Sequence, residues 1–310
     1  MKTKLDKYFR ISQRGSTIGT ELIGGATTFA TMAYILAYMT GAMSAVPGID
    51  LTGVLLCTAL ITAISCIAMG LVANAPIALA PVLVIPNLVA GMVASGEATY
   101  GQAFGTVAIS GIVFLLISVF KLRDLFARSL PKNIKIGIGG AVGLLIASIG
   151  LNTSGLAAAG EDGSFINFSD KSVQLGLIGL AIALLLTYLK ITVNGRTYKI
   201  KGALLISIVL TTIIGIPMGV TVLPENIFTR GALASIGNVA FQVDILGALK
   251  LSFVPFIIML LINDFFGTLG TGLAMAGKAG LLDEDGNFPA FGKVFLVDSS
   301  ATILGSLFGI

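Results

Sequence analysis

Apolar residues occur in long runs that are separated by short charged or turn-rich segments. Runs of about 20 apolar residues are long enough to cross a bilayer as helices, whereas membrane β-strands alternate apolar and polar positions. The runs predict nine spans, at 20–45, 51–73, 77–95, 103–120, 134–151, 173–189, 202–223, 248–276 and 291–310. We therefore expect an all-α polytopic membrane protein with about nine spans.

The third run differs from the others because it contains three prolines. Pro76, Pro81 and Pro86 follow one another at five-residue intervals, and a helix cannot keep its backbone hydrogen bonds through that pattern. Non-helical backbone at membrane depth is tolerated where it is buried in protein or lines a cavity. We expect an extended segment over 77–87 that forms part of a binding site; a kinked helix packed between its neighbours is the alternative.

The basic residues predict the orientation. With the amino terminus in the cytoplasm, all lysines and arginines except Lys171, Arg230 and Lys250 fall on the cytoplasmic side, as the positive-inside rule requires. Segment 1–19 is polar and basic, unlike a cleaved signal peptide, and is expected to stay inside. We expect a multi-pass protein of the cell (inner or plasma) membrane, in contact with lipid, whose clustered basic residues reflect topology instead of nucleic-acid binding.

Composition narrows the chemistry further. The chain is 55% hydrophobic and 11% charged, which excludes an ordinary soluble domain. It contains no histidine, so Ser-His-Asp hydrolases and HExxH zinc proteases are excluded. Its two cysteines, Cys57 and Cys66, lie in one apolar run and are expected to be small buried hydrophobic residues. We therefore expect no enzyme activity, no cofactor and no metal site.

One acidic residue lies in the middle of a span. Asp264 is equally distant from Lys250 and Lys278, which are placed to mark the two membrane interfaces. A charge at that depth costs roughly 2.5–3.5 kcal/mol on insertion scales, so it is expected to face a partner or a wet cavity. Nearby glycines and Thr268 would let a ligand approach the backbone. Asp264 could exchange a proton or accept hydrogen bonds from a substrate; a purely structural carboxyl is the alternative.

Other acids in or near the spans give weaker signals. Asp298 lies in the last run beside Ser299, Ser300 and Thr302, close enough to the interface for water or hydroxyls to satisfy it. Structural and functional roles are therefore equally compatible with Asp298. Glu21, at the start of the first run, is expected to be an interface or helix-start residue.

Several stretches together resemble a known family of membrane carriers. They are 25–36 (GATTFATMAYIL), 69–76 (MGLVANAP) with 78–81 (ALAP), and 278–282 (KAGLL), supported by 131–132, 149–151, 201–203 and 215–217. These stretches resemble the nucleobase:cation symporter-2 superfamily, in its branch of hypoxanthine, guanine and adenine permeases. The resemblance extends over nearly the whole chain.

The resemblance implies an elevator-type carrier of fourteen spans in two inverted repeats of seven, divided between a core and a gate domain. Residues 1–19 would be a cytoplasmic segment, 20–120 core spans 1–4, 121–223 gate spans 5–7, and 246–310 spans 8–9 of the second repeat. Spans 10–14 have no counterpart before Ile310. The chain is therefore expected to be a fragment, or a shortened relative that needs a partner to complete its site. A homodimer is a further expectation.

The resemblance also implies proton-coupled uptake of nucleobases, in particular purines such as hypoxanthine, guanine or adenine. In the family, extended segments of the third and tenth spans meet at the substrate, and an acidic residue of the eighth span contacts the base. By position, Asp264 takes that role and the proton-coupling role. The implied substrate-binding residues are Asp264, Thr268, Thr31, Asn74, Ala78, Leu79 and Asn87.

The chain departs from the family pattern near the expected site. Where relatives usually have Gly-Met-Gly-Leu-Asn-Ala after Ala-Pro, this chain has 82–87 (VLVIPN), which replaces two glycines by valines and moves the asparagine one place. A second family aspartate is Gly267 here. The pocket shape is expected to differ, which leaves two alternatives: a carrier of another small heterocycle or anion on the same fold, or a truncated membrane protein that does not transport.

Overall fold

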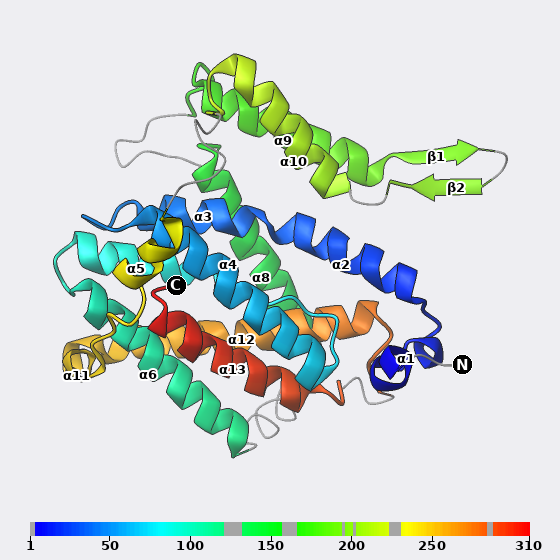
Figure 1. Ribbon diagram of the computed structural model, residues 1–310. Coiled ribbons are helices and arrows are strands. Elements are labelled where there is room, and N and C mark those ends of the chain that lie inside the picture. Colours follow the sequence, from blue (N-terminus) through cyan, green and yellow to red (C-terminus); the bar gives the residue numbers. More distant parts are fainter. Residues whose placement is uncertain are drawn as a thin grey trace. The chain divides into compact units, whose positions relative to one another are not determined.

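The computed structural model describes residues 4–120, 132–156, 166–193, 196–200, 203–222, 231–283 and 288–310 (Figure 1). The chain forms two compact units, each made of two separate stretches of sequence. The first unit contains Met1–Ala33 and Leu144–Thr229, and the second contains Tyr34–Gly143 and Arg230–Ile310. Each unit is described by itself. The assignment of segments to core and gate domains stays a prediction.

Every predicted apolar run contains a helix in the described part of the chain. The helices are α1 (Lys4–Phe9), α2 (Ile18–Met32), α3 (Tyr34–Met43), α4 (Leu51–Ala68), α5 (Val84–Ala94), α6 (Tyr100–Val119), α8 (Lys132–Thr153), α9 (Lys171–Tyr188), α10 (Ala203–Met218), α11 (Ile245–Ala248), α12 (Val254–Lys278) and α13 (Phe291–Leu307). Among the described residues, five helical stretches are long and apolar enough to cross a membrane: Ile18–Met43, Leu51–Ala73, Tyr100–Val119, Lys171–Tyr188 and Leu251–Lys278. The polytopic membrane architecture is thus supported, while the count of nine spans stays a prediction.

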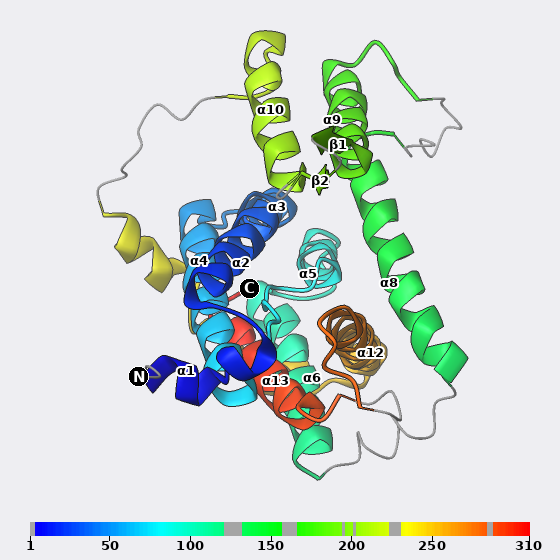
Figure 2. The same cartoon turned by 90° about the vertical axis from the view of Figure 1, so that its right-hand side faces the viewer.

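The first unit departs from an all-helical fold at one hairpin. Strands β1 (Lys190–Val193) and β2 (Arg196–Lys199) pair antiparallel, with Lys190 opposite Lys199 and Val193 opposite Arg196. Both strands contain β-branched residues, which favour extended backbone. In the same unit, α9 and α10 lie side by side (Figure 2), and Gly179 makes room for the side chain of Thr211.

The predicted first span is divided into two helices. The helix that begins after Thr17, whose hydroxyl accepts a hydrogen bond from the Thr20 amide, ends at Met32, and α3 begins at Tyr34. The boundary between the two compact units falls at the same place. Several basic residues that predict the orientation, at 121–131 and 201–202, lie outside the described residues.

The second unit contains the proline-rich segment. After α4 the helix widens into a π-helical turn at Met69–Ala73 and ends at Asn74, which has a left-handed φ of 48°. Residues 74–82 are neither helix nor strand, and α5 then begins at Val84. The break is confirmed, but the expected limits of 77–87 are wrong. Pro86 is helical because it lies in the first turn of α5, where its missing N–H would have no helical partner.

Buried hydrophobic side chains of the second unit form three clusters, two of which position the helices around the site. The larger core joins α3, α4, α5 and α6 through buried residues such as Met39, Val54, Val89 and Phe104. In the smaller cluster, Phe114 of α6 packs against Phe265 of α12 and Phe295 of α13 in edge-to-face contacts. These aromatic contacts fix α12 and α13 to α6, directly beside the residues described next.

Candidate functional site

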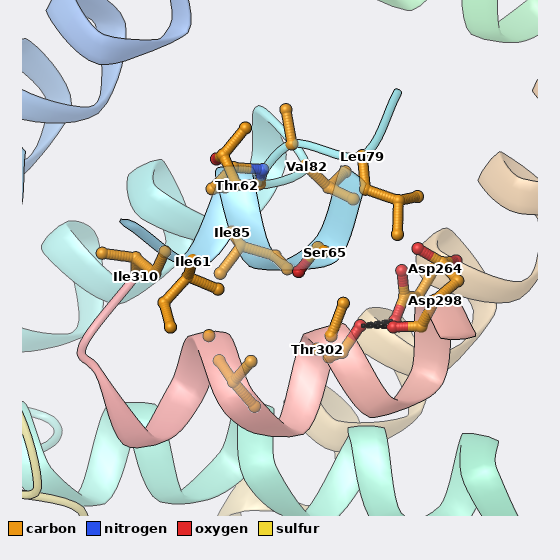
Figure 3. Close-up of a pocket in the computed structure, with 15 residues that line it drawn as sticks. Ile61, Thr62, Ser65, Leu79, Val82, Ile85, Asp264, Asp298, Thr302 and Ile310 are labelled. Atoms are coloured by element: carbon orange, nitrogen blue, oxygen red, sulfur yellow. Dashed lines mark hydrogen bonds between the residues drawn. The ribbon is translucent and has the colours of Figure 1, made fainter. Parts of the chain in front are cut away.

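A pocket in the second unit brings together the broken segment and both acidic spans. Its walls come from α4, α6, α12 and α13, and from the extended segment with the start of α5 (Figure 3). The lining residues are Ile61, Thr62, Ser65, Leu79, Ala80, Pro81, Val82, Ile85, Val107, Asp264, Asp298, Ala301, Thr302, Gly305 and Ile310. The cavity measures about 50 Å³, which is room for a few water molecules. This described lining contains no basic side chain.

Two carboxyl groups from different helices lie at one end of the pocket, and threonines link them crosswise. The Thr302 hydroxyl of α13 donates to Oδ2 of Asp264 on α12 at 2.7 Å. The Thr268 hydroxyl of α12 in turn donates to Oδ2 of Asp298 on α13. Asp264 is only 4% exposed, so its carboxyl faces protein and the cavity, as predicted, and not lipid.

Each of these threonines also contacts the backbone of its own helix. The Thr268 hydroxyl lies 2.9 Å from the carbonyl of Asp264, and the Thr302 hydroxyl lies 3.3 Å from the carbonyl of Asp298. A hydroxyl has one proton to donate. It can donate to an ionised carboxylate, or it can accept from a protonated carboxyl and donate to the carbonyl. The hydroxyl orientations therefore depend on the protonation of the two acids.

The extended segment is held against α4 by a sulfur atom. Sγ of Cys66 lies 3.3 Å from both the amide nitrogen and the carbonyl oxygen of Leu79, accepting from the first and donating to the second. Thiols form weak hydrogen bonds, yet this pair satisfies backbone groups that no helix or strand serves. Cys66, expected to be a small buried hydrophobic residue, thus contributes to the placement of the segment.

The predicted site residues are only partly brought together. Asp264 and Leu79 line the pocket, and Thr268 lies beside it through its contact with Asp298. Ala78 adjoins the lining residue Leu79 without lining the pocket itself, and Asn74 forms the left-handed end of the preceding helix. Thr31 belongs to α2 of the first unit, where its hydroxyl bonds to the carbonyls of Thr27 and Thr28.

Asn87 lies outside the pocket lining and takes part in a different contact. Its amide donates to the hydroxyl of Tyr38 and, at 3.2 Å, to the carbonyl of Leu83. The Tyr38 hydroxyl donates to the same carbonyl at 3.1 Å. This network joins α3 to the start of α5. Asn87 is exposed and braces this junction, and its role in substrate binding stays a prediction.

Several lining residues were not predicted from the sequence. Asp298 was left undecided, and Thr302, Thr62 and Ser65 were not singled out. One signal could have found part of this set: Asp264 and Asp298 are each followed by a threonine four positions later. That spacing places the hydroxyl one helical turn beyond the acid, on the same face. No comparable signal exists for isolated serines and threonines of α4.

Comparisons with known proteins agree with this architecture. The profile of the Permease family (Xan_ur_permease) matches residues 19–310. Adenine permease AdeP of Escherichia coli (strain K12) is 32% identical over 311 residues, covering 98% of this chain and 66% of AdeP. Guanine/hypoxanthine permease GhxP of Escherichia coli O157:H7 is 31% identical over 312 residues, covering 98% of this chain and 67% of GhxP. Guanine/hypoxanthine permease PbuG of Bacillus subtilis (strain 168) is 30% identical over 315 residues, covering 97% and 69%.

The apolar helices indicate a multi-pass membrane protein, and the family match together with the named permeases makes it a transporter and not an enzyme. The chain belongs to the Permease family. It spans about two thirds of the length of these relatives. The resemblance to purine permeases drawn from the sequence is confirmed.

Proposed function

We propose that the chain is part of a proton-coupled carrier for purine nucleobases such as hypoxanthine, guanine or adenine, located in the cell membrane with a cytoplasmic amino terminus. The named activities of the relatives support the substrate class. The observation that carries the proposal is the buried carboxyl of Asp264, midway along α12, which faces a pocket walled by non-helical backbone. Buried acids in membrane spans mark substrate or proton pathways.

In this proposal the two carboxyls perform complementary tasks. An ionised carboxylate accepts hydrogen bonds only, so Asp264 would bind the N–H groups of a nucleobase ring. The threonine links would transmit its change of charge to Asp298, and a proton taken up by the pair would travel with the base. Backbone groups of the extended segment would bind the remaining polar atoms of the base.

The arrangement of the complete carrier is also part of this proposal. Two inverted repeats working as an elevator, with a core that moves against a gate, and assembly as a homodimer would follow from membership of the resembled carrier family. Another small heterocycle is the second candidate substrate, because Val82 lines the pocket at a position where the resembled family pattern has a glycine. An anionic substrate fits less well, since the described lining holds two carboxyls and no basic side chain.

The test is uptake by the native protein, expressed from its own reading frame in cells that lack purine permeases. Wild type is expected to accumulate labelled hypoxanthine, guanine or adenine, and a protonophore is expected to stop accumulation. Asp264→Asn is expected to reduce uptake at least about tenfold, because a hydrogen bond to a charged group contributes about 1.5–3 kcal/mol.

The matched control is Glu97→Gln, which removes an exposed carboxylate outside the pocket. It should transport like wild type at equal expression. Undiminished uptake by Asp264→Asn would remove Asp264 from the site. Uptake of uracil or another heterocycle in preference to all three purines would favour the second candidate substrate.

A further inference from the structure

Three hydroxyl groups in the described part of the chain are buried without a hydrogen-bond partner. They belong to Thr62, Ser65 and Ser110. Helical serines and threonines ordinarily donate to a carbonyl three or four residues earlier. Thr58 of α4 does so toward Val54 at 2.7 Å, and Ser299 of α13 toward Phe295 at 2.8 Å. Thr62 and Ser65 lie on the same helix as Thr58 and lack this bond.

The position of the unpaired hydroxyls separates them into two groups. Thr62 and Ser65 stand one helical turn apart on α4 and line the pocket, opposite the wall that carries Asp264 and Asp298 (Figure 3). Ser65 is 5% exposed, and its oxygen points into the space between α4 and α13. Ser110 lies on α6 and does not line the pocket. The pocket thus has an acidic wall and a hydroxyl wall.

The two walls differ in the hydrogen bonds that they offer. Ionised carboxylates only accept, whereas a hydroxyl both donates and accepts and can rotate to suit its partner. A buried hydroxyl without a partner carries a free-energy cost that a ligand atom can remove. A flat heterocycle with N–H groups on one edge and a carbonyl, ring nitrogen or amino group on another would satisfy both walls at once.

We propose that Ser65, assisted by Thr62, binds the nucleobase on the edge away from Asp264. This inference rests on the proposed function and adds α4 to the binding site, since none of the substrate-binding residues implied by the resemblance lies in α4. A rotating hydroxyl would allow either a carbonyl or an amino group to bind at that edge. Ser65 is then a substrate contact that helps bases of different edge chemistry to bind.

The test compares Ser65→Ala with Ser110→Ala in the full native protein, measuring equilibrium binding of hypoxanthine, guanine and adenine together with thermal unfolding in detergent. Ser65→Ala is expected to weaken binding of at least one base about tenfold. Its melting temperature should equal or exceed that of wild type, because no hydrogen bond within the protein is lost. Ser110→Ala should show the same unfolding behaviour with unchanged affinity. Thr62→Val is the second variant, with a smaller loss of affinity expected.

The outcomes distinguish this inference from the proposed function. Binding by wild type that is unchanged in both Ser65→Ala and Thr62→Val would overturn the hydroxyl wall and leave the carrier proposal intact. A lowered melting temperature with unchanged affinity would assign Ser65 a structural role and also overturn it. Failure of wild type to bind any of the three bases would overturn both proposals.

Discussion

Thr268 and Thr302 each follow an aspartate by one helical turn and reach the aspartate of the other helix. Neither hydroxyl can satisfy both the carboxylate and its own backbone carbonyl with a single proton. A proton arriving at one acid therefore changes the bonding of a threonine on the neighbouring span. These two residues would be positioning groups for the carboxyls in the proposed carrier.

Thr302→Val tests this role. The change keeps the shape of the side chain but removes the donor to Asp264, and uptake is expected to fall about tenfold or more because a buried charge loses a partner. Thr302→Ser should restore most of the activity. Thr271→Val is the control, since Thr271 is exposed and its hydroxyl donates to the carbonyl of Gly267 on its own helix. Equal uptake by Thr302→Val and wild type would argue against the link.

The sequence predicted the site unevenly at this scale. Asp264 could be found because a charge in the middle of an apolar run has few structural explanations. Asp298 could not, because its nearness to the interface allowed water to satisfy it equally well. Ser65 is invisible to sequence reasoning, since a serine in a helix normally bonds to its own backbone and only the coordinates show that this one does not.

At the scale of elements, the proline spacing predicted that the third run would break but not where. Helix geometry explains the difference: a proline is forbidden in a helix interior but suits the first turn, so Pro86 joins α5. At the other end, the π-helical turn and Asn74 end the helix before the first predicted extended residue. Neither feature has a hydrophobic periodicity from which it could be recognised.

The start of α4 is fixed to the short helical turn at Ala232–Asn238 by several contacts. Asp50 caps α4 by accepting from the Gly53 amide at 3.1 Å, and its other oxygen accepts from the Asn238 side chain at 2.9 Å. The hydrogen bond from Asn238, and then that from Gly53, lower the pKa of Asp50 below its usual value. Gly53 lies directly against the carbonyl of Ser235, and this close approach is possible because glycine has no Cβ.

Gly53→Ala is expected to destabilise this junction. The added Cβ would meet the Ser235 carbonyl oxygen and lie 2.6 Å from Cγ2 of Val239, and overpacking of this kind costs about 1–3 kcal/mol. Thermal unfolding in detergent measures the effect. Gly41→Ala in α3 is the control, because no atom lies within 4 Å of its added Cβ; it should unfold at or above the wild-type temperature. A similar response from both variants would contradict the tight contact.

At the scale of the whole molecule, hydropathy alone located a helix in every predicted run, because a bilayer forces each apolar segment to satisfy its backbone internally. Two features escaped it. The hairpin β1–β2 lies in the short connection between the predicted spans 173–189 and 202–223, and the division at Ala33 lies inside the predicted span 20–45. Both depend on local backbone preferences that do not alter the average hydropathy.

The predicted orientation is open to a labelling experiment in intact cells. Gln13→Cys, in the basic amino-terminal segment, should be protected from a membrane-impermeant thiol reagent, while Phe168→Cys, between α8 and α9, should react. The reason is the excess of basic residues assigned to the cytoplasmic side. Wild type, with only Cys57 and Cys66, gives the background. Reaction of Gln13→Cys with protection of Phe168→Cys would reverse the topology.

The stretch between Asn74 and Val82 also restricts how such a carrier can move. Its backbone amides and carbonyls make no hydrogen bonds of a regular helix, and lipid acyl chains have no groups that could form hydrogen bonds with them. Moving residues 74–82 into lipid would leave these backbone groups without hydrogen-bond partners. The free-energy cost would exceed what binding of most substrates provides. In the proposed carrier, translocation would have to move this segment together with α4 and α13, because separating it from them would leave its backbone groups without hydrogen-bond partners.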